Sequence, residues 1–192
     1  FDNLSAELLR QYVGAQWPLK TMTGVFAPRF HIEGCPTDQI RIRGALVFKQ
    51  LAIDAPDLFT APLSPGDGQA EFDVNWKPQR LGIALLDFRS KELKFTVKGE
   101  TRLPVANDPH VQLNLTAPLL PLVVLRKYFP LKTLDSPTLE SFVGSLQEGE
   151  LQLKKLGING SLSELRNAAQ SAAKGLVWFD GELRNVGSKP VA

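Results

Sequence analysis

Few residues of this 192-residue chain are of the types that do chemistry, and the closest such pair is His31 and Cys35. A cysteine thiolate four residues from a histidine could act as a nucleophile beside its general base, with Asp38 near by. However, alternation places His31 on the polar side of a predicted strand, and Cys35 lies in a turn that reads GCP. We therefore expect a solvent-facing histidine and a turn thiol rather than a catalytic pair.

Two further groups contain residues that could do chemistry, a possible metal pair and a carboxylate pair. His110 follows Asp108 and Pro109, but two ligands do not complete a metal site, so a turn that leads into a strand is the favoured interpretation. Asp54 and Asp57 lie in a proline-rich segment, where capping and solvation are the ordinary roles. The sequence has no glycine-rich phosphate loop and no serine-elbow motif. We predict that the protein is not an enzyme and that it uses no cofactor and no metal.

Basic residues gather between positions 80 and 102. Because strand alternation places Lys94 and Lys98 on one face with Glu92 and Glu100, this face has mixed charge. The net charge of the chain is only +2, whereas nucleic-acid-binding domains have a more one-sided surface with exposed aromatic residues. We expect no nucleic-acid partner, and a surface that approaches anionic lipid headgroups fits the pattern better.

Period-two alternation of apolar and polar residues predicts strands over most of the chain. The predicted strands cover residues 24–34, 39–53, 69–76, 81–88, 91–103, 110–116, 149–160 and 176–187. Short turns join many of them, and one face of most strands is apolar while the other is polar. These features predict a twisted, mostly antiparallel sheet.

Helical spacing and capping residues predict a few helices beside this sheet. They cover residues 2–17, 118–129, 135–148 and 161–175, and a long loop is predicted over 55–68. The fold class predicted is therefore α+β, a twisted, mostly antiparallel sheet with a few helices packed at one face or end.

The tetrapeptide PLKT occurs at 18–21 and again at 130–133, each time after a predicted helix. This predicts a repeated helix-plus-strands unit, with a first unit over 1–118 and a second, partial unit over 119–192 that continues the same sheet and core.

The apolar faces of the strands are the remaining candidate site. Large apolar side chains on these faces could line one concave wall: Phe26, Phe30, Phe72, Trp76, Leu81, Ile83, Leu85, Phe95 and Val97. One interpretation is a core that the first helix covers, and the other is a groove that stays open for acyl chains. Burial against helix or lipid is favourable by about 25 cal/mol per Å² in both cases, so the sequence leaves the two alternatives open.

Five stretches of the chain resemble AsmA-like proteins. They are a helix that ends in WPL before TG, the run RIRGALVFKQLAIDAPDL, the run LLDFRSKELKFTVKGETRL, and the segments DPHVQLNLTAPLLPLVVLRKYFP and EGELQLKKLGINGSLSELRN. Together these stretches cover most of the chain.

The resemblance implies a non-enzymatic segment of a periplasmic body in a Gram-negative envelope. Such a body is a β-rich trough that takes part in outer-membrane biogenesis and passes phospholipid along an apolar groove. The implied partners are phospholipid acyl chains and adjacent β-rich units of a longer parent chain. The parent would be held in the inner membrane by an N-terminal anchor outside this sequence. The alternative is a structural or protein-interaction module with a filled core and no lipid binding.

Overall fold

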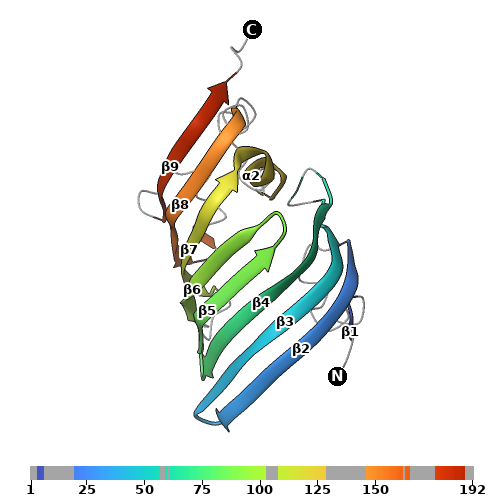
Figure 1. Cartoon of the computed structure of the whole chain (residues 1–192). Coiled ribbons are helices and arrows are strands. Elements are labelled where there is room, and N and C mark those ends of the chain that lie inside the picture. The colour runs from blue at the N-terminus through green and yellow to red at the C-terminus, as the bar shows by residue number, and fades with distance from the viewer. Residues whose placement is uncertain are drawn as a thin grey trace.

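Nine strands of this protein form one antiparallel sheet in which each strand lies beside its neighbours in the sequence (Figure 1). The computed structural model describes residues 4–6, 20–56, 59, 61–102, 108–128, 146–161, 163–164 and 176–188. The strands are β1 (Leu4–Ser5), β2 (Thr21–Cys35), β3 (Gln39–Asp54), β4 (Leu63–Lys77), β5 (Arg80–Ser90), β6 (Lys94–Arg102), β7 (His110–Pro121), β8 (Leu146–Ser161) and β9 (Val177–Ser188). A short helix, α2 (Leu122–Tyr128), follows β7.

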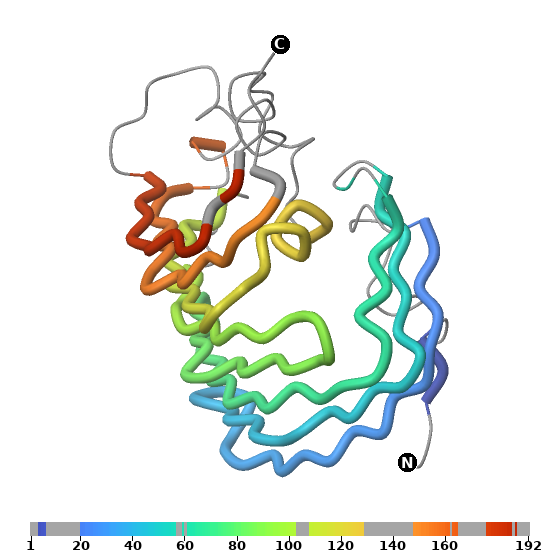
Figure 2. The backbone as a smooth tube through the Cα atoms, turned by 45° about the horizontal axis from the view of Figure 1, so that its top comes forward, coloured from blue at the N-terminus to red at the C-terminus, as the bar shows by residue number. Residues whose placement is uncertain are grey.

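The sheet curves around a hollow and so forms a trough (Figure 2). The long strands β2, β3 and β4 run through the base of this trough and up one wall, and α2 lies within the hollow. The curvature coincides with irregular pairing, such as the register shift between Phe48 and Leu51, where Gln50 has a φ of 51°. An extra residue of this kind bends a strand and increases its twist.

The predicted α+β class is wrong, because the described residues are almost entirely strand. Among the elements whose bounds the structure describes, α2 is the one helix, and it has seven residues; Ala6, Ser163 and Glu164 are the other described helical positions. Residues 118–121, which open a predicted helix, instead complete β7, and Leu146 at the end of another predicted helix begins β8. Most of the other predicted helical residues lie outside the described part of the chain.

The loop predicted over 55–68 is also shorter than expected. Residues 63–68 belong to β4, and the pairs Ile53–Leu63 and Leu51–Gly66 join them to β3. Pro65 is tolerated there because the pairing of β4 with β5 begins only at Gly68. The absent N–H of Pro65 therefore costs no hydrogen bond to β5.

Aromatic rings cross the sheet to form part of the core. Phe48 on β3 stacks on Phe88 on β5 at a centroid distance of 5.1 Å, and Phe88 stacks on Phe95 at 5.0 Å. Phe48 reaches across β4 because its cross-strand partner there is Gly68, which has no side chain. A second cluster joins Ala117, Leu120 and Leu153.

The predicted boundary between the two units, after residue 118, falls inside β7. Strands from both parts belong to the same sheet. Pro18 and Leu19 of the first PLKT copy and all of the second copy lie outside the described residues, so the repeat stays a prediction.

Candidate functional site: the concave apolar face

The two faces of the sheet are chemically distinct, as the cross-strand register shows. Two apolar rows cross all eight strands from β2 to β9. The first row is Phe30, Gly44, Phe72, Leu86, Val97, Leu115, Leu156 and Phe179. The second row is Ile32, Ile42, Val74, Ile83, Gly99, Leu113, Ile158 and Val177. We call the face that carries these rows the concave face.

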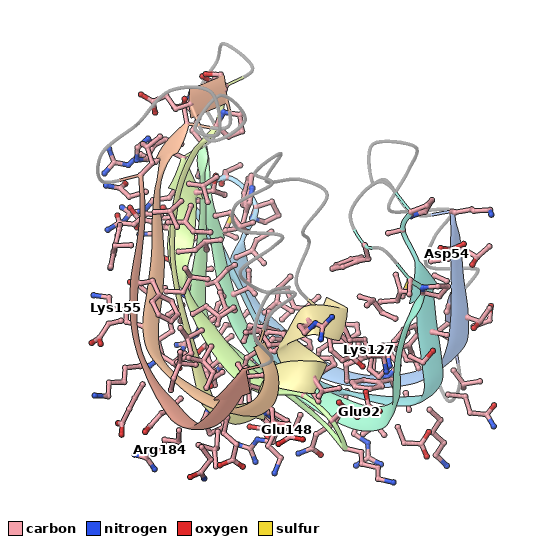
Figure 3. All side chains as sticks on the ribbon, turned by 90° about the horizontal axis from the view of Figure 1, so that it is seen from above. Asp54, Glu92, Lys127, Glu148, Lys155 and Arg184 are labelled. Carbon is pink, nitrogen blue, oxygen red and sulfur yellow. The ribbon has the colours of Figure 1, made fainter. Side chains whose placement is uncertain are left out.

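Two charged side chains of β8 and β9 point away from the inside of the trough, from the opposite, convex face. Lys155, which precedes Leu156 on β8, and Arg184 both project outward from the trough wall (Figure 3). Because side chains alternate along a strand, an outward Lys155 places Leu156 inward. The apolar rows therefore line the inside of the trough.

The concave face is only partly buried. Phe72, Ile83 and Val97 are half-buried. Exposure is larger at the ends of the rows, where Phe30 is 54% exposed and Phe179 is 59% exposed. A continuous apolar surface of this kind in contact with solvent is unusual for a monomeric soluble protein and is typical of a binding surface.

The predicted wall residues fall into three groups in the structure. Phe72, Trp76, Leu81, Ile83 and Val97 are half-buried on the concave face, and the exposed Phe30 lies in its first row.

Two other members pack in apolar clusters. Phe26 is 3% exposed and packs in a cluster with Ala6 and Phe48, and Phe95 lies in the aromatic stack.

Leu85 is placed on the convex face, opposite Asp73. A bulge at Ala84 causes this, because Ile83 pairs with Val74 while the next paired residue, Leu85, faces Asp73. Leu86 therefore takes the inward position.

Sequence reasoning also missed the part of the wall that β8 and β9 provide. Leu156, Ile158, Val177 and Phe179 complete the two rows there. The alternation within 149–160 and 176–187 carries this signal, but it does not reveal that these strands continue the same concave face.

Helix α2 is held against the β5–β6 turn by polar contacts at one side of the hollow. Lys127 Nζ donates to Glu92 Oε2 at 2.8 Å, and the Tyr128 hydroxyl donates to the same oxygen at 3.1 Å. Hydrogen bonding from Lys127 lowers the pKa of Glu92, while burial, and then Glu92, raises the pKa of Tyr128 to about 12. Leu122 packs on Leu151 at the start of the helix.

A shallow pocket of about 380 Å³ lies between α2 and the β5–β6 turn. Its lining combines apolar and charged side chains, namely Lys91, Glu92, Lys94, Leu119, Leu120, Pro121 and Val124. Lys91 and Lys94 form no ion pair with any of the described residues.

Ion pairs link charged side chains of the described strands on the convex face. Arg41 donates to Asp73 through Nε at 2.9 Å and Nη2 at 2.5 Å, and this hydrogen bonding lowers the pKa of the carboxyl group. Arg43 binds Glu33 at 2.9 Å. Such a balanced face suits solvent rather than a strongly charged partner.

The residues that might have done chemistry lie in ordinary surroundings. Cys35 Sγ lies 3.1 Å from Thr37 Oγ1, and this hydrogen bond lowers the pKa of the thiol. His31 lies four residues earlier on the extended strand β2, about 13 Å away along the backbone, and its Nε2 is 3.9 Å from Glu33. The two side chains are therefore not a nucleophile–base pair.

The possible metal pair and the carboxylate pair lie near protein groups where the structure describes them. His110 Nε2 lies 2.9 Å from Asn159 Oδ1. Asp108 accepts hydrogen bonds from the backbone N–H and the hydroxyl of Ser163, at 3.0 and 2.6 Å. Asp54 lies 3.8 Å from Lys20 Nζ, and Asp57 is outside the described residues. Across the described ranges, no three His, Cys, Asp or Glu residues come close enough to hold a metal ion.

Among the described residues, no helix has the length and apolar character that crossing a membrane requires. Comparison of the chain with protein-family models, with curated proteins and with solved structures gave no match. These comparisons show no family, so the AsmA-like resemblance stays a prediction.

Proposed function

We propose that this chain is a non-enzymatic segment of a lipid-holding trough in an AsmA-like envelope protein. In this role it lies in the periplasm and contributes to the movement of phospholipid between membranes during outer-membrane biogenesis. The single observation that carries the proposal is the pair of apolar rows, which cross all eight strands from β2 to β9 without a polar side chain.

Acyl chains fit such a surface because hydrophobic burial has no directional requirement. Each square ångström of apolar surface removed from water is worth about 25 cal/mol, so a chain laid along one row gains affinity without hydrogen bonds. The polar headgroup would stay in water at the rim, where the strands end. Lipid would then move along the rows with little change in energy, since adjacent positions are chemically alike.

The test is native mass spectrometry of the protein after incubation with vesicles of bacterial phospholipid. We expect bound lipid on the wild-type chain. A Val97→Glu variant should lose it, because a carboxylate in the first row makes burial of an acyl chain there unfavourable. Val97 suits this test better than Phe95, whose ring belongs to the aromatic stack.

Lys98→Glu is the matched control, since Lys98 is the next residue on β6 and is exposed. Circular dichroism and thermal unfolding should show that both variants remain folded. Equal lipid binding by both variants would place the lipid outside the trough. A wild-type mass free of lipid, when an established lipid carrier loads under the same conditions, would favour the alternative of a structural module with a filled core.

A further inference from the structure

Exposed apolar side chains concentrate on the two outermost long strands. Ten large apolar side chains of the described residues are exposed, and seven of them belong to β2 or β9. The seven are Val25, Phe30, Ile32, Val177, Trp178, Phe179 and Leu183. Such a distribution marks the two edges of the sheet, rather than its middle, as contact surfaces.

Both edges also present backbone groups for pairing. On the outer side of β2, the described residues supply only β1, which pairs with Val25 and Phe26. In the same described part of the chain, β9 pairs with β8 alone. An edge of this length is a template for another strand.

We propose that β9 of one copy of this chain pairs antiparallel with β2 of a second copy, head to tail, with Asp180 opposite Arg29. Strand direction permits this contact. The eight strands from β2 to β9 alternate in direction, so a copy placed further along the trough presents its β2 antiparallel to β9. The trough then continues from one copy into the next.

This register joins both apolar rows. It places Phe179 opposite Phe30 of the second copy and Val177 opposite Ile32, which are the end residues of the first and second rows. All four side chains are more than half exposed in the single chain, with values of 59%, 54%, 53% and 55%. Pairing would cover all four at once.

The same register matches charge on the convex face. Arg29 and Asp180 are exposed, and among the described residues neither has an ion-pair partner. Lys155, the β8 residue opposite Asp180, instead places its Nζ over the Trp178 ring at 5.8 Å. Asp180 is therefore available to Arg29 of the second copy.

A register shifted by two residues towards the C-terminal end of β9 is less favourable. It would place Arg29 opposite Glu182, whose carboxylate already accepts a hydrogen bond from Arg184 at 3.1 Å. It would also place Phe30 opposite Gly181 rather than opposite a second aromatic ring.

The contact is small because β1 already occupies part of the β2 edge. The six residues from 27 to 32 would pair with 177 to 182, which belongs to the class of weak, transient interfaces. Because the contact is heterologous, each added copy leaves a free edge at both ends of the assembly. Association should therefore be weak, concentration-dependent and open-ended.

Sedimentation velocity of the lipid-free chain over a concentration series tests the proposal. We expect the average mass to rise with concentration. Asp180→Arg alone and Arg29→Asp alone should each suppress the rise, since each puts like charges opposite one another. The variant that carries both substitutions should restore it. A single species of monomer mass up to the solubility limit, or a double variant that associates no better than either single variant, would overturn the proposal.

Cysteine pairing tests the register in a Cys35→Ser background. An equimolar mixture of the Asp180→Cys and Arg29→Cys chains should form a mixed disulfide under mild oxidation. A mixture of Asp180→Cys with Ala27→Cys should form much less, because those positions are offset by two residues. Equal yields in the two mixtures would contradict the register. Neither experiment contains lipid, so its result is independent of whether the trough binds acyl chains.

Discussion

Gly68 is the residue on which the aromatic stack depends. A Cβ atom built on Gly68 would lie 2.5 Å from Phe48 Cζ and 2.3 Å from the carbonyl oxygen of Arg89. The Phe48 ring is 1% exposed, so it has little room to move away. We expect Gly68→Ala to lower the free energy of unfolding by about 1–3 kcal/mol, the usual cost of overpacking.

Urea unfolding measures this change, and Gly82→Ala is the matched control on the neighbouring strand. A Cβ on Gly82 would come no closer than 3.7 Å to another atom, an ordinary contact distance. The control should therefore change the free energy of unfolding by no more than about 0.5 kcal/mol. Equal destabilisation by both variants would mean that the contact between the Phe48 ring and Gly68 does not determine the loss in the free energy of unfolding.

At the residue scale, alternation predicted the inward side chains wherever a strand is regular. Phe72 and Trp76 are in this class, since β4 keeps its period through these positions. It failed at Leu85, because the bulge at Ala84 adds one residue to β5 and turns the next side chain to the other face. The run LGIALLDF is apolar at both parities, so the sequence contains no signal for where the extra residue lies.

At the element scale, the contact of α2 with the β5–β6 turn can be measured through the titration of Tyr128. The chain has two tyrosines, so a Tyr12→Phe background leaves Tyr128 as the only phenol. We expect absorbance at the tyrosinate band to show a midpoint of about 12 in the folded protein, against about 10 for a free tyrosine. Because the pKa of Tyr128 is raised in the folded protein, the stabilising contribution of its neutral phenol is complete below pH 10. That contribution is lost as the pH rises towards 12.

Glu92→Gln separates the two causes of this shift. Burial is the larger cause and the Glu92 carboxylate the next, so the variant should lower the Tyr128 midpoint only part of the way towards 10. A midpoint near 10 already in the parent protein would show that α2 does not hold Tyr128 against the sheet.

Elements were predictable where local pattern and pairing agree. The strands over 24–34 and 39–53 are found because apolar and polar residues alternate there between the two faces of the sheet. Residues 63–68 were assigned to a loop because Pro65 and Gly66 are turn formers. Their strand conformation depends on β3, which is distant in sequence and extends beyond the end of β5.

At the scale of the whole molecule, the antiparallel sheet was predictable from short turns, whereas the trough was expected only from the AsmA-like resemblance and not from the local pattern. Closure into a trough depends on where bulges occur, such as those between Thr23 and Val25 and between Phe48 and Leu51. These depend on the backbone conformation of Gly24 and Gln50, at φ values of 128° and 51°. Gln50 also uses a long-range contact, since its N–H donates to Asp67 Oδ1 at 2.8 Å. The alternation of residues along a strand does not predict such a contact.

From the sequential strand order we predict how strongly the backbone amides of each strand are protected from hydrogen exchange. Each inner strand is paired on both sides, so successive amides donate alternately to one neighbour and then to the other. In the part of the chain that the structure describes, β9 is paired with β8 alone. We therefore expect continuous protection through β3 and alternating protection from Val177 to Arg184, measured by NMR on a dilute sample without lipid.

The concentrated sample then distinguishes three architectures. Head-to-tail pairing would protect the second set of β9 amides as concentration rises, and Asp180→Arg would abolish that gain. Continuous protection of β9 in the dilute monomer would mean that another part of the same chain covers the edge, which contradicts an open trough end. Uniformly fast exchange through β9, with β8 still protected, would mean that the sheet ends at β8. The apolar rows would then stop at Leu156 and Ile158, one strand short of the length on which the assembly depends.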